Sequence, residues 1–268
     1  MAPGPPNPVR PGVRPVLVQL TAGGRTLNVR VDAPTGPVPP AAMLPLYRNI
    51  AEMLTTVAVK AAEAGGDRVT CRKGCAACCR QVVAVSPLEA RELMKLAGRL
   101  PEPLRTRVTE RFAAARRRIE AEAPQLLPQL LHPEDAAAAG TGPTTDAELH
   151  EFSRAYLRLG IACPFLEDEA CSIYEQRPVA CRQYVVVSDP AHCATLSPEV
   201  RAVAPAGGPA HAWPPAAERT PRGRPVGFVA LTLAPEFVAE HPQEPPARPG
   251  IDLLDEYLTR MRQRGKWT

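Results

Sequence analysis

The sequence predicts a mainly α-helical protein with small β elements, in which helices surround a module of cysteine residues that ligate a metal. Apolar residues recur at helical spacing in several segments, segments of β character are short, and the eight cysteines fall into two groups. A chain of 268 residues can bury roughly 70–75% of its unfolded surface, so it needs no covalent staples to fold. We therefore expect an α+β protein with one globular domain.

Proline sets the expected domain organisation. It accounts for 33 of 268 residues, or ~12% against an average of ~5%. The prolines are concentrated at the N-terminus, near 204–225 and near 242–249, where we expect loops or disorder. We predict three parts: a proline-rich N-terminus with a β-hairpin (1–40), a helical cysteine-cluster metal-binding domain (41–200), and a proline-rich loop, strand and helix that pack on that domain (201–268).

The N-terminal elements follow from turn residues and periodicity. Residues 15–20 and 26–31 flank an Ala-Gly-Gly-Arg turn at 22–25, which is typical of a β-hairpin. From 44 to 64, apolar residues recur every three or four positions, and a Gly-Gly pair follows, as at many helix ends. The sequence therefore predicts a hairpin and then a long helix.

Two capping boxes open further helices. Ser86 with Glu89 starts a helix that should run to about residue 98, and Thr145 with Glu148 starts another that ends at Gly160. Between them, 104–121 carries one apolar stripe. The inward residues of the helix at 104–121 are Leu104, Val108, Phe112, Ala115 and Ile119. Those of the helix after Thr145 are Leu149, Phe152, Tyr156 and Leu159.

The remaining chain offers weaker patterns. Residues 163–193 indicate a compact region of short extended pieces and turns, 226–233 a strand, and 251–262 a terminal helix. We expect the small β pieces to lie near the cysteines.

Charge and hydropathy limit the partners. The chain has 32 Lys and Arg against 28 Asp and Glu, and a net charge of +4 gives no argument for nucleic acid. The arginines at 116–118 lack neighbouring aromatic residues that could stack on bases, so they indicate a solvated helix face. No apolar run approaches a membrane span, and the run at 16–18 is too short for a signal-peptide core. We expect a cytoplasmic protein without a membrane partner.

A reducing compartment favours metal or redox chemistry for closely spaced cysteines. Two residues between cysteines let both sulfurs face one ion, and Gly74 or the Ala76-Ala77 pair permits the tight turn. Thiolate suits both zinc and iron–sulfur clusters, so the cofactor stays open between them. The predicted metal ligands are Cys71, Cys75, Cys78 and Cys79 in the first group, and Cys163, Cys171, Cys181 and Cys193 in the second.

Other residues near the cysteines can act as ligands or charge partners. Cys78 and Cys79 project in different directions, so they can serve two metals, or one can simply be buried. His192 is better explained as a surface residue than as a ligand. The basic residues at 72, 73, 80, 177 and 182 should offset thiolate charge.

The pattern resembles the YkgJ-type cysteine-cluster family, whose members are described as zinc- or iron-chelating. The resemblance rests on the run at 71–79, Cys163-Pro-Phe-Leu, Cys171-Ser-Ile-Tyr, Arg177-Pro178 and Cys181-Arg182, within about 71–193. It implies a metal-binding domain. A related cluster occurs in a flagellin lysine-N-methylase, so the resemblance also allows an enzyme.

Three functions remain open from the sequence: a structural metal centre, a redox or group-transfer enzyme using the cluster, and a metal chaperone. The spacing at 71–78 also matches radical enzymes that use S-adenosylmethionine. Those enzymes resemble partial or full (β/α) barrels, whereas this chain has consecutive helices after the motif and a fourth adjacent cysteine. We therefore set that alternative aside. The sequence names no substrate and no protein partner.

Overall fold

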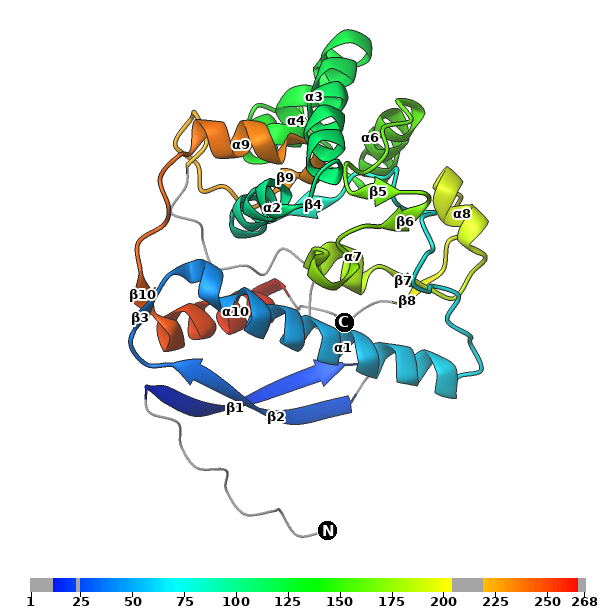
Figure 1. The fold of residues 1–268 in the computed structure, drawn as a ribbon. Coiled ribbons are helices and arrows are strands. Elements are labelled where there is room, and N and C mark those ends of the chain that lie inside the picture. The colour runs from blue at the N-terminus through cyan, green and yellow to red at the C-terminus, as the bar shows by residue number, and fades with distance from the viewer. Residues whose placement is uncertain (1–11, 23–24, 204–218, 265–268) are drawn as a thin grey trace.

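The computed structural model describes residues 12–22, 25–203 and 219–264. Within them the predicted fold class is confirmed: ten α-helices dominate, and all the sheets are two-stranded and antiparallel (Figure 1). The predicted loops at 1–11 and 204–218 lie outside the described residues. No helix of the described chain is both long enough and apolar enough to cross a membrane.

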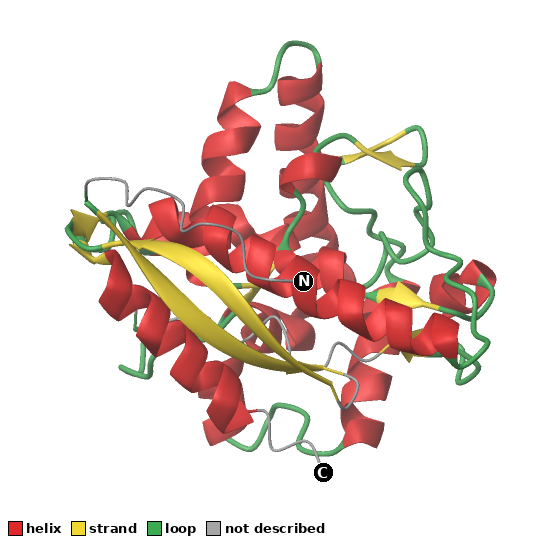
Figure 2. Cartoon of the chain, turned by 90° about the horizontal axis from the view of Figure 1, so that it is seen from below, coloured by secondary structure: helices red, strands yellow, loops and turns green. Residues whose placement is uncertain are grey.

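One hydrophobic core joins the two ends of the chain. The predicted hairpin is confirmed, with Val16 opposite Val31, and it lies across two helices (Figure 2). Its inward residues Val18, Val31 and Ala33 are buried against those helices. The elements of this core are β1 (Val13–Ala22), β2 (Arg25–Pro34), η1 (Pro40–Met43), α1 (Leu44–Ala64) and α10 (Gly250–Arg264).

Helix α1 has the predicted bounds: its buried face runs from Leu44 to Ala58, and Gly65 caps its C-terminus. Tyr47 on this face stacks on Tyr257 of α10, with ring centroids 4.3 Å apart. Its hydroxyl donates a hydrogen bond of 3.1 Å to the Leu253 carbonyl. A short sheet, β3 (Pro37–Val38) with β10 (Arg248–Pro249), adds a further link between the ends. We call the hairpin, α1 and α10 the terminal module.

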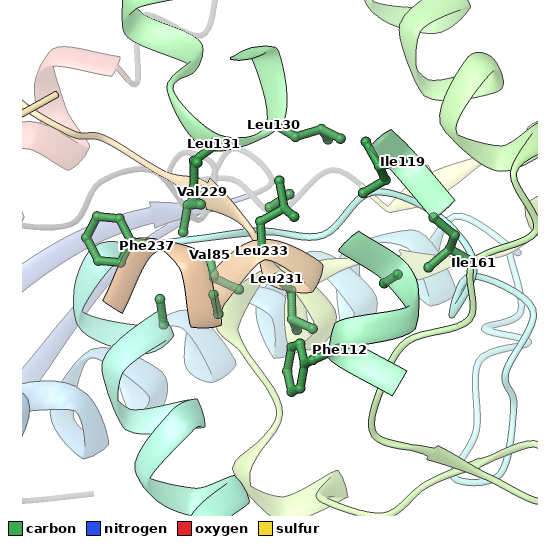
Figure 3. Packing of buried hydrophobic residues seen from close by; sticks show 14 of the residues in the cluster. Val85, Phe112, Ile119, Leu130, Leu131, Ile161, Val229, Leu231, Leu233 and Phe237 are labelled. Carbon is green, nitrogen blue, oxygen red and sulfur yellow. The ribbon is translucent and has the colours of Figure 1, made fainter. Parts of the chain in front are cut away.

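A second core lies among the central helices (Figure 3). Both predicted capping boxes are present, at Ser86 and at Thr145. The predicted stripe of α3 is buried from Val108 to Ile119, and Phe112 meets Phe165 edge to face at 5.6 Å. The main elements are α2 (Pro87–Arg99), α3 (Leu104–Glu122), α6 (Asp146–Arg158), and β4 (Ala84–Val85) paired with β9 (Val229–Ala230).

Two expectations about this core are wrong. Leu149 is 51% exposed, because α6 lies at the periphery and its only fully buried residue is Tyr156, about two turns further on. The strand predicted over 226–233 pairs only at Val229 and Ala230. The chain then forms a 3-10 helix, η4 (Leu231–Leu233), and α9 (Ala234–Glu240), because Pro235 favours the first turn of a helix.

Several short helices were not predicted. None exceeds seven residues, so each spans less than two helical turns, which is too short to show a periodic pattern of apolar residues. A proline at or just before the first turn marks each one, and that signal could have found them. Besides α9, they are α4 (Leu127–Leu131), α5 (Pro133–Ala138), α7 (Val179–Gln183) and α8 (Pro190–Thr195).

Candidate metal centre

The two cysteine groups meet where the loop at 70–81 runs beside the segment 163–203 (Figure 1). The Cys163 N–H donates to the Cys79 carbonyl at 2.7 Å, which joins the groups directly. At the start of the loop, the Thr70 hydroxyl donates to the Ser188 carbonyl at 2.6 Å. At its end, Gln81 donates to the Cys193 carbonyl, also at 2.6 Å. The loop is thus held at both ends and in the middle.

The first group sits in a series of tight turns. The N–H of Cys75 donates to the Arg72 carbonyl at 3.0 Å, and the N–H of Cys79 to the Ala76 carbonyl at 2.9 Å. Gly74 has φ +87°, a conformation that glycine adopts without strain. The expected role of Gly74 in the turn is confirmed.

The second group begins on a small hairpin. Strand β5 (Leu166–Glu167) pairs with β6 (Ala170–Cys171), which places Cys171 opposite Leu166. Because the Leu166 N–H also donates to the Cys163 carbonyl at 2.9 Å, Cys163 and Cys171 lie at the same end of this hairpin.

The last two cysteines lie on the short helices α7 and α8. Cys181 belongs to α7, whose first N–H, from Val179, donates to the Glu89 carboxylate at 2.8 Å. Glu89 is fully buried and also closes the capping box of α2 with Ser86. Cys193 is buried on α8, beyond β7 (Val185–Val186), which pairs with β8 (Ala202–Val203). The involvement of Glu89 in this region was not predicted.

Backbone N–H groups point at several sulfurs, as expected for a site that holds thiolates. The Val186 N–H donates to Cys71 Sγ at 3.3 Å. Cys163 accepts from the N–H of Phe165, and Cys171 from the N–H of Ile173, in both cases two residues onward. Such bonds favour the charged form of the sulfur.

Burial acts in the opposite direction. It raises the pKa of Cys163 to about 12 and the pKa of Cys181 well above its ordinary value. Burial also raises the pKa values of Cys71, Cys171 and Cys193. The pKa of Cys78 is raised by its hydrogen bond with Cys79 and then by burial. These six thiols are therefore protonated in the metal-free protein near neutral pH.

Cys78 interacts electrostatically with cysteines of both groups. A negative charge on Cys78 contributes to the raised pKa of five other cysteines, after burial as the main cause. These five are Cys71, Cys163, Cys171, Cys181 and Cys193. Residues from both cysteine groups thus lie within electrostatic reach of one sulfur.

Most of the nearby basic side chains serve other partners than expected. Arg80 forms two hydrogen bonds with Glu169, of 2.6 and 3.1 Å, and Lys73 pairs with Glu175 at 3.4 Å. Arg182 bonds to the Arg177 carbonyl at 3.1 Å and lies 3.5 Å from Glu52.

Two arginines do act on the cysteines. Arg177 lies over the Tyr174 ring at 3.8 Å and lowers the pKa of Cys171 against the larger effect of burial. Arg111, which was not predicted, acts in the same direction on the pKa of Cys163, again against burial. Fewer of the predicted basic side chains therefore act on the cysteines than the sequence indicated.

All eight cysteines are free thiols; Cys193 is buried and the other seven are half-buried. His192 lies at the surface, 37% exposed, 4.0 Å from Glu199. Over the described ranges, no three His, Cys, Asp or Glu side chains are arranged so that they could hold an ion as they stand. The donor chemistry nevertheless suits zinc or iron, because both are bound by cysteine thiolate, and backbone N–H bonds stabilise the thiolate form.

Residues 70–199 match the family model described as "CxxCxxCC: Putative zinc- or iron-chelating domain". The resemblance predicted from the sequence is confirmed, and the matched segment contains all eight cysteines. It leaves out the hairpin, α1 and α10. No curated protein and no solved structure matches the chain.

Proposed function

We propose that the eight cysteines bind zinc or iron as thiolates and that the metal holds the cysteine region together, because residues 70–199 match the model of a zinc- or iron-chelating domain. The observation that carries the proposal is the convergence of the two groups. The Cys79–Cys163 hydrogen bond joins them, and after burial a charge on Cys78 of the first group raises the pKa of Cys163 and Cys193 in the second.

The construction of the segment 163–203 supports a structural metal. Its sheets have strands of two residues, and Leu166, Val186 and Val203 are buried without belonging to either hydrophobic core. In small zinc domains, metal binding supplies ~10–16 kcal/mol of folding free energy. Zinc would act as a cross-link here, whereas an iron–sulfur cluster would add one-electron chemistry.

Transfer of the metal to another protein is a second candidate. A metal donor needs ligands that an acceptor can reach, and seven of the eight cysteines are half-buried rather than enclosed. A structural centre should release the ion slowly to a chelator, whereas a donor site should release it quickly.

One preparation tests both functions. Tag-free protein purified without oxygen is analysed for zinc, iron and acid-labile sulfide, and then challenged with a chromogenic chelator. We expect stoichiometric zinc, or iron with an equal amount of sulfide and visible absorbance. Slow release supports the structural centre, and release on mixing supports metal transfer. Protein without metal, or full metal content in Cys78→Ser, would contradict the proposal.

A further inference from the structure

The two edges of the β1–β2 hairpin differ in what they offer to another strand. Hydrogen-bonded and outward-facing positions alternate along an antiparallel pair. The Thr35 N–H donates to the Gly12 carbonyl at 3.0 Å, and these two residues continue the register in which Pro15 lies opposite Asp32. Pro15 is therefore at an outward-facing position of β1, where its ring removes the N–H donor. A proline at this place protects the edge of β1 from pairing.

The edge of β2 has no such interruption between Asn28 and Asp32. By the same alternation, the N–H and C=O groups of Asn28, Arg30 and Asp32 face outward. All three residues are exposed, and no residue within the described ranges bonds to these backbone groups. An exposed edge with unpaired donors and acceptors is a template for pairing with another strand.

An apolar groove runs along the inner side of this edge. It has a volume of about 800 Å³ and lies between β2 and α1. Val29 and Val31 of β2 line one side, and Leu46, Met53 and Val57 of α1 line the other. The three α1 side chains are only partly buried in the terminal core. A strand added beside β2, at the usual spacing of about 4.8 Å, would cover them.

The outer side chains of β2 favour a second copy of the same strand. Arg30 and Asp32 lie on the face of the hairpin opposite the buried Val31, and within the described residues neither forms an ion pair. In an antiparallel pair of two β2 strands with a two-fold axis at Val31, Arg30 of each copy lies opposite Asp32 of the other. An axis at Arg30 would oppose two arginines, and an axis at Asp32 would oppose two aspartates. Because like charges destabilise cross-strand pairs and opposite charges stabilise them, the charges select the axis at Val31.

We propose that the chain forms a two-fold symmetric dimer in which the β2 edges of two copies pair antiparallel about Val31. Arg30 of each copy exchanges both backbone hydrogen bonds with Asp32 of the second copy, and the two side chains form an ion pair. The hairpins join into one continuous sheet, and each copy covers the apolar groove of the other. This surface lies outside residues 70–199, so dimerisation goes beyond the proposed metal binding and does not depend on it.

Sedimentation equilibrium of the full chain, with charge variants, tests the dimer. At high concentration we expect twice the mass of one 28.8 kDa chain. Arg30→Asp and Asp32→Arg each oppose like charges at both symmetry-related pairs, so each should raise the dissociation constant by roughly tenfold to a hundredfold. An equimolar mixture of the two variants again opposes unlike charges at every pair, so the mixture should recover dimers. Arg14→Asp is the matched control, because Arg14 is exposed on β1, and it should leave the dissociation constant unchanged.

Three results would overturn the inference. They are a monomer at every concentration, which would leave the β2 edge to a strand of another protein, dimers that persist in both single variants, and a mixture that stays monomeric. Metal content should be the same in all variants. A chain that dimerises as expected but binds no metal would overturn the proposed function alone.

The unmodified chain gives a second test that does not depend on the folding of a variant. Hydrogen exchange is compared at concentrations well below and well above the dissociation constant. Amides of 28–32 should exchange more slowly at the higher concentration, whereas amides of 16–18 on β1 should not change. Equal exchange of 28–32 at both concentrations would contradict pairing through this edge.

Discussion

The terminal module and the cysteine region are stabilised by different means. In the terminal module, side chains of the hairpin, α1 and α10 form one continuous apolar core, with the Tyr47–Tyr257 stack inside it. In the segment 163–203, Phe165 and Ile173 join the central core and Val179 joins the terminal core. Its other buried apolar residues contribute to neither core, and hydrogen bonds hold its short strands.

The difference shows where a metal matters for folding. A chain segment keeps its conformation only if its interactions exceed the entropy lost on ordering, ~1–2 kcal/mol per residue for the backbone alone. Apolar burial meets that cost in the terminal module. In the cysteine region the eight thiols are the main unused source of stabilisation, so metal binding should decide whether it is ordered.

The largest expected effect is therefore that of metal removal. In a metal-free chain, amides of 70–81 and 163–203 should exchange with solvent many times faster, whereas amides of α1 and α10 should keep their protection. Hydrogen exchange with mass spectrometry, with and without zinc, measures both regions in one sample. Equal protection of the cysteine region in both samples would show that it is ordered without metal.

The matched perturbation of the other region is Leu54→Ala. Leu54 is 1% exposed in the terminal core, and removing such a side chain costs about 2–5 kcal/mol. We expect lower thermal stability with unchanged metal content. Metal loss in this variant would mean that the two regions do not act separately.

The next effect is a pH dependence confined to the cysteine region. The pKa values of Cys71, Cys163, Cys171, Cys181 and Cys193 are raised, chiefly by burial, above the ordinary thiol value of 9.0. Each of these thiols must release a proton to bind metal, so the apparent metal affinity rises with pH. The rise is up to tenfold per pH unit for each proton released, or ~10⁴ per pH unit for a metal bound by four thiols. Chelator competition between about pH 6 and about pH 8 measures the slope, and an affinity independent of pH contradicts it.

The same raised pKa values affect the metal-free protein with the opposite sign. A buried thiol with a raised pKa contributes stability that is present below about pH 9 and is lost as the pH rises through the folded-state value, about 12 for Cys163. Metal-free protein should therefore unfold more easily in alkali, while its affinity for metal increases. Unfolding curves at several pH values give the control for the competition experiment.

The sequence predicted features that depend on interactions between residues close together in the chain, and it missed those that depend on distant residues. The capping boxes at Ser86 and Thr145, the stripe of α3 and the cysteine spacing each lie within a few residues, so the chain itself displays them. The bond from Tyr47 to Leu253 spans 206 residues, and nothing in the local sequence announces it. The exposure of Leu149 likewise depends on where α6 packs, which its periodicity cannot reveal.

Glu89 shows the same limit within the candidate site. Its place in a capping box could be predicted, whereas its bond to Val179, 90 residues away, could not. Through that bond, Glu89 of α2 accepts the first N–H of α7, the helix that carries Cys181. Burial raises the pKa of Glu89, and nearby Arg48 partly opposes this.

The smallest effect, and the most specific, is expected from Glu89→Gln. The amide keeps the shape of the side chain but weakens the bonds to Val179 and Ser86, at a cost of about 1–3 kcal/mol for a fully buried group. Glu148→Gln is the control, because Glu148 closes the capping box of α6 in the same way but is exposed and hydrogen-bonds to Thr144 and Thr145. If Glu89 positions Cys181, Glu89→Gln alone should weaken metal binding by the chain, measured by competition with a chromogenic chelator. Equal metal affinity in the two variants would restrict Glu89 to capping α2 and would leave α7 to be held by Val179 and Arg182.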